Sequence, residues 1–323
     1  MEEKLTIIIP CFNSENTITE TIESIYTQNI DIPFEIIMVD DKSTDKTLEV
    51  IKKLSQKHQE IKIIKHNKNN GGGATRNTAV SNSSGNIIFC LDSDDLLPAD
   101  TLPKMYKYMD KKKCDGVSVY KSIKFSGNDR GDIDHVDVSP YSDKKIPFIS
   151  LFTDSDTFNP LEVNFMYTRQ AFNKIGGYPT EHGFDTQGFC WRFLCSGLTA
   201  YTCPNTSYLH RINFKESYYL REYNTGKINF NWRDILLENY FVFNNDTIDF
   251  ILKFNCQDFS KNLMEEVKKR DCILARNHKH AVLKKHPPLK LPKLAKQNIK
   301  RNSIRGYCVR IKKIIMELFH KKR

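Results

Sequence analysis

The sequence predicts an α/β fold in which a Rossmann-like, mostly parallel sheet is flanked by helices. Strand-length apolar runs alternate with helix-length amphipathic segments four times within residues 5–91. A polar or glycine-rich cluster follows strand after strand, at the carboxyl ends where open sheets of this kind bind ligands. The chain of 323 residues contains no run of 18 apolar residues, so we predict no membrane-spanning helix.

The first strand and helix are expected within residues 5–25. The apolar segment Leu5–Pro10 is the first strand, and Pro10 ends it because proline has no N–H to donate to a sheet. Asn13 or Ser14 can cap the following helix. The buried stripe of this helix recurs at helical spacing: Ile18, Ile22 and Ile25.

The next two units repeat this pattern. Phe34–Val39 is the second strand and Ile61–Ile64 is the third. A glycine-rich turn, Asn69–Asn77, leads into a third helix, and Asn86–Leu91 is the fourth strand. The second helix directs three apolar side chains inward: Leu48, Ile51 and Leu54. The alternation predicts a parallel sheet with helices on both faces.

The rest of the body is expected to add helices, strands and one long loop. Residues 125–145 are polar and rich in Asp, Ser and Gly, which is typical of a loop. The remaining predicted elements follow in order: a helix over Pro98–Met109, strands over Gly116–Lys124 and Val163–Tyr167, a helix near Gln187–Ser196 stopped by Gly197, and a closing segment Tyr208–Arg211.

An acidic cluster follows the fourth strand directly. Asp92, Asp94 and Asp95 lie where the strand ends and a loop begins. Neighbouring carboxylates repel one another and are costly to desolvate unless a cation lies among them. Carboxylate oxygens select hard ions such as Mg²⁺ or Mn²⁺, which in turn hold phosphates. An acidic turn that only caps a helix is the alternative interpretation.

Other polar groups are expected at the same edge of the sheet. Asp40 and Asp41 end the second strand, and Arg76 lies just inside the helix that follows the glycine-rich turn. Carboxylates for a metal, helix N-termini and an arginine together suit a nucleotide diphosphate. The turn is not a P-loop, because no Gly-Lys-Ser/Thr follows, and its glycine spacing does not fit the dinucleotide fingerprint.

Taken in order, these motifs resemble those of the family 2 glycosyltransferases, which have the GT-A fold. The resemblance covers residues 4–217, and its motifs are Ile9–Asn13, Val39–Asp45, Asn70–Asn77, Leu91–Asp95 and Ile175–Tyr178. It implies a metal-dependent, inverting enzyme that uses Mn²⁺ or Mg²⁺. The reaction it implies moves a sugar from a UDP-sugar to a hydroxyl of a glycan or lipid-linked acceptor in cell-surface polysaccharide synthesis.

The resemblance also implies roles for individual residues. Asp185 would be the catalytic base, and Asp94 the most direct metal ligand, beside Asp92 and His210. Asp41 would accept a hydrogen bond from the uracil ring. The implied donor-nucleotide set is Pro10, Asn13, Asp40, Asp41, Gly72, Arg76, Asp92, Ser93 and Arg211. The residues implied near the sugar or behind the metal site are Asp95, Gly177 and Tyr178.

Two departures from the family pattern leave alternatives open. The family usually has a Glu-Asp pair at the base, whereas this chain has Phe184 before Asp185, and Asn213 stands where a His is expected. The first departure motivates a second hypothesis, a nucleotide-sugar-binding or scaffold protein whose catalysis is weakened. A third is a polyprenyl-phosphate sugar synthase.

The charge distribution divides the chain. Residues 263–323 carry 19 Lys or Arg against four Asp or Glu, whereas the first 262 residues carry 30 and 35. We expect a catalytic domain over 1–217, a helical extension over 218–262 and a basic tail over 263–323. The tail contains an amphipathic pattern over 303–320, suited to an anionic membrane surface. A solvated or disordered tail is the alternative, and nucleic acid is not expected because no binding motif accompanies the charge.

Three features of the sequence bear on where in the cell the protein is expected. The start of the chain lacks the pattern of a signal peptide. The nine cysteines are scattered and odd in number, which favours reduced thiols. Together with the basic tail, these features predict a cytoplasmic protein attached peripherally to the inner face of the cell membrane.

Overall fold

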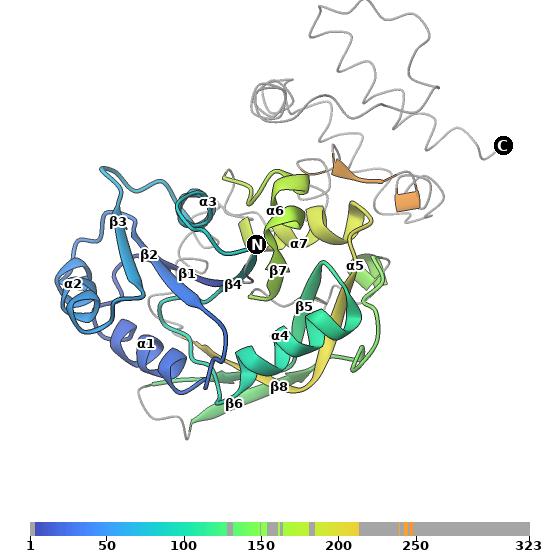
Figure 1. Ribbon diagram of the computed structural model, residues 1–323, viewed down its shortest axis with the longest axis horizontal. Helices are drawn as coiled ribbons and strands as arrows, with labels where there is room; N and C mark the ends of the chain where they lie inside the picture. The colour runs from blue at the N-terminus through green and yellow to red at the C-terminus, as the bar shows by residue number, and fades with distance from the viewer. Residues whose placement is uncertain are drawn as a thin grey trace, which may run out of the picture. The chain divides into compact units, whose positions relative to one another are not determined.

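Figure 1 shows a computed structural model of the chain. It falls into two units, Met1–Leu194 with Leu198–Phe230, and Cys195–Gly197 with Asn231–Arg323. The domain boundaries predicted at 217 and 262, most of the extension and all of the basic tail lie outside the described residues. Those described are 4–127, 132–148, 150–153, 161, 164–180, 185–212, 239, 242–244 and 246–247.

The first half of the sheet is the predicted strand–helix alternation. Its strands β1 to β4 are mutually parallel, and Figure 1 shows α1 and α2 on one face of them and α3 on the other. The elements are β1 (Leu5–Cys11), α1 (Ile18–Tyr26), β2 (Phe34–Asp40), α2 (Thr47–Lys57), β3 (Ile61–Lys65), α3 (Gly72–Ser81) and β4 (Ile87–Cys90).

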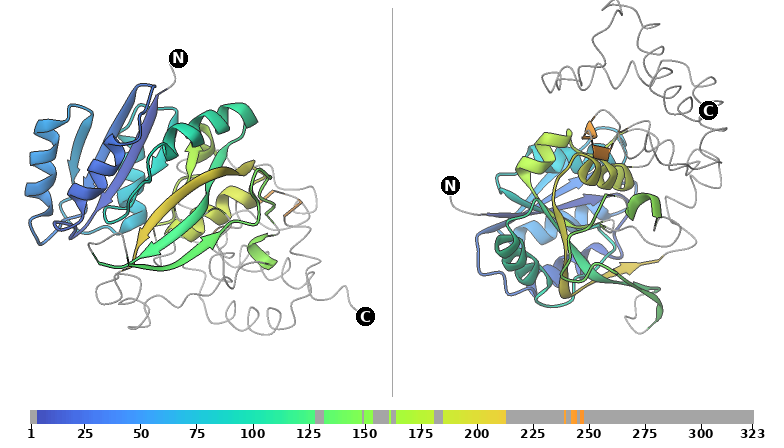
Figure 2. Two further views of the ribbon diagram at one scale, coloured as in Figure 1. Left: turned by 90° about the horizontal axis from the view of Figure 1, so that it is seen from below. Right: turned by 90° about the vertical axis from the view of Figure 1, so that its right-hand side faces the viewer.

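The second half makes the sheet mixed. Strand β7 pairs antiparallel with both β4 and β5, whereas β5 and β8 are parallel and run side by side in Figure 2. The strand order is β3-β2-β1-β4-β7-β5-β6, with β8 paired to β5. The elements are α4 (Thr101–Lys112), β5 (Gly116–Phe125), β6 (Ile133–Val138), α5 (Ser150–Thr153), β7 (Met166–Thr168), α6 (Arg169–Ile175), α7 (Asp185–Cys195) and β8 (Ala200–Arg211).

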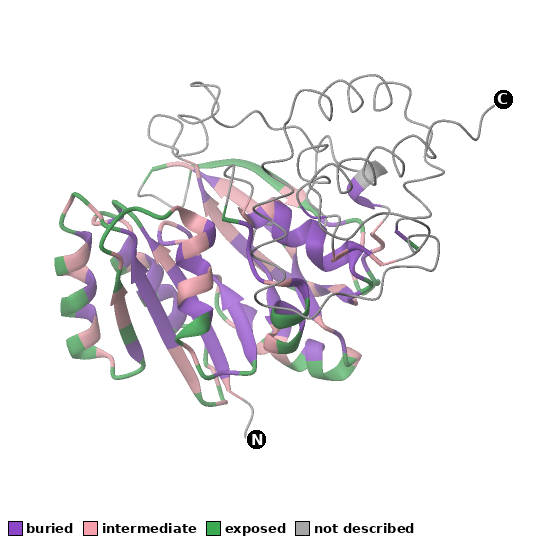
Figure 3. Cartoon of the chain, turned by 90° about the horizontal axis from the view of Figure 1, so that it is seen from above, coloured by how far each residue is buried: buried purple, intermediate pink, exposed green. Residues whose placement is uncertain are grey.

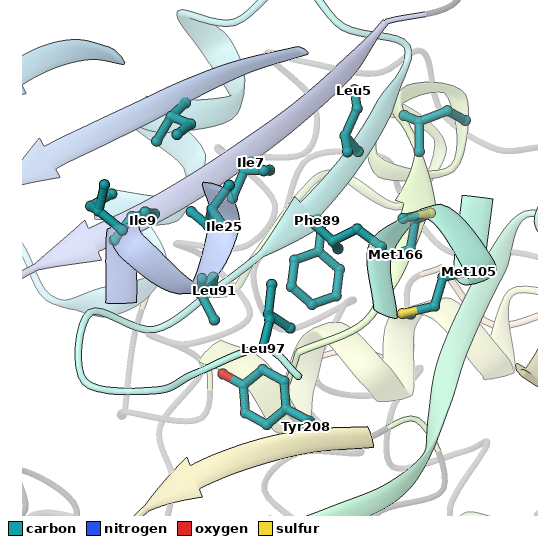
Figure 4. Close-up of a cluster of buried hydrophobic side chains, with 14 of the residues drawn as sticks. Leu5, Ile7, Ile9, Ile25, Phe89, Leu91, Leu97, Met105, Met166 and Tyr208 are labelled. Carbon is teal, nitrogen blue, oxygen red and sulfur yellow. The ribbon is translucent and has the colours of Figure 1, made fainter. Parts of the chain in front are cut away.

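The side chains of the central strands point alternately to the two faces of the sheet, and nearly all of them are buried. Leu5, Ile7 and Ile9 of β1 join a core cluster that includes Ile25 of α1 and Met105 of α4 (Figure 4). The alternate residues of β1 face the side covered by α3. Both faces are therefore covered, which explains why the central strands are nearly continuous apolar runs and lie buried in Figure 3.

The register of the strands brings the polar clusters to one edge. Cys11 of β1 lies opposite Asp40 of β2, and Ile8 lies opposite Cys90 of β4. Beyond these pairs, Asp41 N donates to Cys11 O at 2.9 Å. The ends of β1, β2 and β4 thus carry their motifs to a common rim.

Several predicted boundaries need correction. Helix α1 begins at Ile18 after Thr17, not after Asn13 or Ser14. The carbonyl of Ser14 accepts from Thr17 N and Ile18 N, and the Asn13 side chain instead accepts from Thr44 N at 2.8 Å. Helix α6 was not predicted; it ends at the Gly-Gly turn.

The predicted loop over residues 125–145 contains strand β6. This strand pairs antiparallel with the second half of β5 and forms an edge of the sheet. Its sequence mixes Asp and His with Ile and Val, and nearly all of it is exposed, including Ile133 at 55%. An edge strand whose side chains are mostly exposed needs no apolar run, so the composition of this segment predicted a loop.

Two further expectations concern the described part of the chain. The six cysteines described there are buried. Among the described helices, none has the length and hydropathy needed to cross a membrane.

Glu35 at the start of β2 joins three segments at the amino ends of the strands, on the side of the sheet away from the rim. Its carboxylate accepts from Thr6 Oγ1 at 2.8 Å, Ser84 N at 2.6 Å, Gly85 N at 3.0 Å and Lys4 Nζ at 3.1 Å. Burial raises the pKa of Glu35, but these hydrogen bonds outweigh it and lower the pKa to about 2.

We predict that Glu35→Gln lowers the free energy of unfolding at pH 7 by roughly 1.5–3 kcal/mol, since charge-assisted hydrogen bonds are lost. A depressed folded-state pKa stabilises the fold above the ordinary value of 4.5 and loses that effect as pH falls towards 2. The difference from wild type should therefore shrink at pH 3. Urea unfolding at both pH values tests this, with Glu23→Gln on the exposed face of α1 as control. Equal destabilisation at both pH values would contradict the assignment.

Candidate active site

The site is organised around the buried guanidinium of Arg76 on α3, which is 7% exposed. Its Nη1 donates to Asp185 Oδ2 and its Nη2 donates to Asp92 Oδ1, both at 2.5 Å. Its Nε donates to Cys90 Sγ at 3.3 Å. One side chain therefore joins the first residue of α7 to the loop after β4, which lie 109 and 16 residues away in sequence.

Burial and charge act against each other in this cluster. Burial lowers the pKa of Arg76, but the carboxylates of Asp92 and Asp185 outweigh it and raise the pKa well above its ordinary value. Burial also raises the pKa of Asp185, and the charge of Arg76 opposes that rise. Asp185 is thus a partly buried carboxylate of raised proton affinity, which is the property a general base needs.

Glycines at the start of α3 make room for these contacts. A Cβ on Gly72 would lie 2.5 Å from Asp185 Oδ2 and 2.6 Å from Arg76 Nη1. A Cβ on Gly73 would lie 1.8 Å from the carbonyl oxygen of Pro179. Gly72, implied as a nucleotide contact, therefore has a second reason to lack a side chain, because the Arg76–Asp185 pair occupies that space.

Asp41 is directed at the glycine-rich turn. Its Oδ2 accepts from Gly71 N at 2.8 Å, and its Oδ1 accepts from Asn70 N at 2.9 Å. His66 Nδ1 lies 2.7 Å from the same Oδ1. Asp40 is buried beside it and accepts from Ser43 N at 3.3 Å. Asp41 was implied to accept a hydrogen bond from the uracil ring. Its carboxylate already accepts hydrogen bonds from this turn, so the turn and the uracil ring would have to share it.

The acidic cluster does not consist of three equivalent carboxylates. Asp92 is paired with Arg76, and its Oδ2 accepts from Asn164 Nδ2 at 3.2 Å. Asp95 is fully buried and faces β8, where it accepts from Arg211 N at 2.7 Å and Tyr208 OH at 2.6 Å. The expectation that all three require a dication is therefore too strong, because the protein supplies partners for two.

Asp94 is the carboxylate that remains. Burial, followed by repulsion from Asp95 and Asp92, raises the pKa of Asp94 to about 7. Among the described residues, no side chain donates a hydrogen bond to the carboxylate of Asp94. A carboxyl group in this state is stabilised in its charged form by a nearby cation.

The residues at the rim fit a dication only if the substrate shares in binding it. In the described part of the chain, no group of three His, Cys, Asp or Glu side chains is placed to hold a metal ion. Mg²⁺ typically binds through one or two carboxylates together with substrate phosphates and water. Asp94 supplies such a carboxylate. His210 lies with Nδ1 3.2 Å from Asp95 Oδ2, and the charge of Asp95 raises the pKa of His210 to about 9.

Arg211 and Ser93 secure the acidic loop. Arg211 Nε donates to Asp94 O at 2.8 Å, and its Nη2 donates to Glu20 Oε2 at 2.6 Å. The carbonyl of Ser93 accepts from the hydroxyls of Thr17, just before α1, and Thr21 on α1. In this arrangement Arg211 faces protein partners, and the structure gives no support for its implied contact with a diphosphate.

Two other residues of the implied donor set, Pro10 and Asn13, belong to the motif at the end of β1. Pro10 lies in β1 opposite Val39. Asn13 has a φ of 51° and its backbone N–H donates to Ser43 Oγ at 3.1 Å. They bring the ends of β1 and β2 together at the rim.

The Gly-Gly-Tyr motif supports α3 from behind. Asn77 bonds both backbone groups of Tyr178, at 2.9 Å each. Gly177 has a φ of +73°, and a Cβ there would lie 2.6 Å from Asn77 Oδ1. Tyr178 is buried, stacks on Phe189 with ring centroids 4.0 Å apart and has the Arg76 guanidinium 5.8 Å from its ring centroid. This motif lies behind the site and supports Arg76.

Three residues of the site were not singled out from the sequence. Asn164 Nδ2 bonds Asp92 and Tyr208 OH, and His66 bonds Asp41. A lone Asn, Tyr or His outside any motif carries no signal in a single sequence. Phe184 and Asn213, the two departures from the family pattern, lie outside the described residues.

Comparison with known proteins gives one family. The model of "Glycosyl transferase family 2" matches residues 6–176. The chain is 36% identical over 114 residues to a poly(ribitol-phosphate) beta-glucosyltransferase of Bacillus spizizenii, covering 35% of this chain and 18% of that protein. It is 36% identical over 116 residues to poly(ribitol-phosphate) beta-N-acetylglucosaminyltransferase TarS of Staphylococcus aureus, covering 35% and 20%. The chain thus spans about a fifth of the length of these curated relatives.

Solved structures agree on the fold. Residues 1–349 of S. aureus TarS, in complex with UDP-GlcNAc, superimpose with a TM-score of 0.54 at 20% identity, covering 84% of this chain and 83% of that one. The mannosyltransferase PcManGT from Pyrobaculum calidifontis, in complex with GDP-Man and Mn²⁺, gives a TM-score of 0.51 at 17% identity, covering 99% and 82%. The predicted GT-A class is confirmed by these neighbours.

We predict that Gly73→Ala displaces the start of α3, since its Cβ meets the backbone oxygen of Pro179. Overpacking of this kind costs roughly 1–3 kcal/mol of stability, despite alanine's better helix propensity. Thermal unfolding measures the loss, with Ser81→Ala on the exposed last turn of the same helix as control. An unchanged melting temperature in Gly73→Ala would mean that the close approach is not required.

Proposed function

The chain belongs to glycosyl transferase family 2, and from this membership we propose that it transfers a sugar from a UDP-sugar to a hydroxyl of a glycan acceptor in cell-surface polymer synthesis. The observation that carries the proposal is the contact of one buried guanidinium with both Asp92 and Asp185 at the rim of the sheet. A carboxylate suited to act as a base thus adjoins a cation suited to hold a diphosphate.

The donor class is supported by both site and relatives. Arg76 presents a planar fork, which suits phosphate oxygens as well as carboxylates. The structural neighbours are complexes with UDP-GlcNAc, UDP and GDP-Man. We choose UDP because the TarS complexes contain it.

The proposed chemistry is a single inverting displacement. Asp185 accepts the proton of the acceptor hydroxyl while that oxygen forms a bond to the anomeric carbon. The bond from the anomeric carbon to the diphosphate oxygen breaks, and UDP leaves with the electron pair. Arg76 orients Asp185 and lies where it can stabilise the charge of the leaving group. Alignment of the two substrates contributes much of the rate.

Mn²⁺ or Mg²⁺ is proposed as the cofactor. Asp94 would hold it, with Asp92 nearby, and the bound ion would offset charge on the diphosphate. Asp95 and Tyr208 keep the loop that carries Asp94 attached to β8. The Mn²⁺ in the PcManGT complex supports a divalent ion in this fold.

The acceptor and the place of action are proposed from the relatives and the tail. Two curated relatives are named as poly(ribitol-phosphate) transferases, which supports a polymer as acceptor. That this polymer is lipid-linked and reaches the cell surface is part of the proposal. Attachment to the inner face of the membrane through residues 263–323 remains a prediction, because the tail lies outside the described residues.

We predict that Asp185→Asn keeps UDP binding but reduces turnover by about 10²-fold or more, since the base is lost. UDP release from a panel of UDP-sugars with Mn²⁺, and UDP affinity by calorimetry, measure the two effects. Asp110→Asn on the exposed side of α4 is the control.

Three outcomes separate the hypotheses. Normal turnover in Asp185→Asn would reject this base. Tight UDP binding without turnover in the wild-type chain would favour the nucleotide-sugar-binding alternative. A phosphate acceptor in place of a hydroxyl acceptor would favour the polyprenyl-phosphate sugar synthase.

A further inference from the structure

His66 is a largely buried side chain that joins the end of β3 to two segments of the site. Its backbone N–H donates to Asp40 O at 2.9 Å. Its imidazole Nδ1 lies 2.7 Å from Asp41 Oδ1, and its Nε2 lies 3.0 Å from Thr78 Oγ1 on α3. Only 11% of the side chain is exposed. One imidazole thus connects the end of β2 to the helix that carries Arg76.

The contact with Asp41 has a defined direction. An ionised carboxylate only accepts hydrogen bonds, so Nδ1 carries the proton in this contact. The same carboxylate accepts from the amides of Asn70 and Gly71 at 2.9 and 2.8 Å. His66 therefore fixes the orientation of a carboxylate that in turn fixes two consecutive amides of the glycine-rich turn.

The turn determines where α3 begins. The carbonyl of Gly71 accepts from Thr75 N at 3.1 Å and from Thr75 Oγ1 at 2.7 Å. Arg76 is the next residue. A shift of the turn is therefore passed on within one helical turn to the guanidinium that bridges Asp92 and Asp185.

We propose that His66 is a positioning residue for binding of the nucleotide sugar, acting through Asp41 and the Asn70–Gly71 turn. The consequence for binding rests on the proposed function, whereas the positioning itself does not. His66 contacts neither Arg76 nor the acidic loop in the described part of the chain, so it acts on them only through the turn, and its main effect is on donor affinity.

Two amide substitutions separate the two contacts of the ring. An Asn side chain at this position places an N–H donor close to the site of Nδ1, whereas a Gln side chain reaches towards the site of Nε2. His66→Asn therefore keeps the bond to Asp41 and loses Thr78, and His66→Gln does the reverse. Thr78→Val is the matched control, since it removes the partner of Nε2 and leaves Asp41 bonded.

The expected result is a split between the variants. His66→Gln should weaken UDP binding, measured by calorimetry, about ten-fold or more and raise the donor KM in parallel, with kcat at saturating donor within about three-fold of wild type. His66→Asn and Thr78→Val should stay within about two-fold in affinity. Amide hydrogen exchange at Asn70 and Gly71 should become faster in His66→Gln alone.

Other outcomes overturn the proposal. Equal UDP affinity in both His66 variants, or an equal loss in both with a lower melting temperature, would assign the imidazole a merely structural role. A wild-type chain that neither binds nor turns over UDP-sugars would reject the proposed function. In that case the exchange data still decide: faster exchange in His66→Gln alone supports the positioning role, and unchanged exchange refutes it.

Discussion

The buried contact of Arg76 with Asp92 and Asp185 is the interaction on which the rest of the site depends. Three charged groups largely shielded from solvent are stable together only because the guanidinium offsets the carboxylate charges and donates a hydrogen bond to each of them. The features around them serve this contact. Gly72 and Gly73 leave the space for it, and the Gly-Gly-Tyr motif supports the helix from behind. The rim of the sheet supplies Asp92, and the start of α7 supplies Asp185.

Pairing within the protein also explains why one carboxylate is different. Asp95 accepts hydrogen bonds from β8, and Asp92 is paired with Arg76. Asp94 has no such partner among the described side chains, and burial raises its pKa to about 7. A cluster of three aspartates thus becomes one loop anchor, one partner for arginine and one candidate ligand. Specific roles arise from the partners each carboxylate meets, because the same residue type is neutralised differently at adjacent positions.

The sequence predicted most of the fold, since long apolar runs and glycine-rich turns are local signals. It failed for β6, where an exposed edge strand has no apolar run, and for the start of α1, where Asn13 bonds Thr44 and does not cap the helix. The site residues were named mainly through family motifs. Their pairing was not predictable, because Arg76 and Asp185 are 109 residues apart, and His66 belongs to no motif.

The most direct test is the affinity of UDP for Arg76→Lys, measured by calorimetry with Mn²⁺ present. Lysine keeps the positive charge beside the two carboxylates but lacks the planar fork that reaches both of them and a diphosphate. If Arg76 is the centre of a donor site, UDP binding weakens about ten-fold or more. A dissociation constant within about two-fold of wild type, in a chain that still melts cooperatively, would contradict the account.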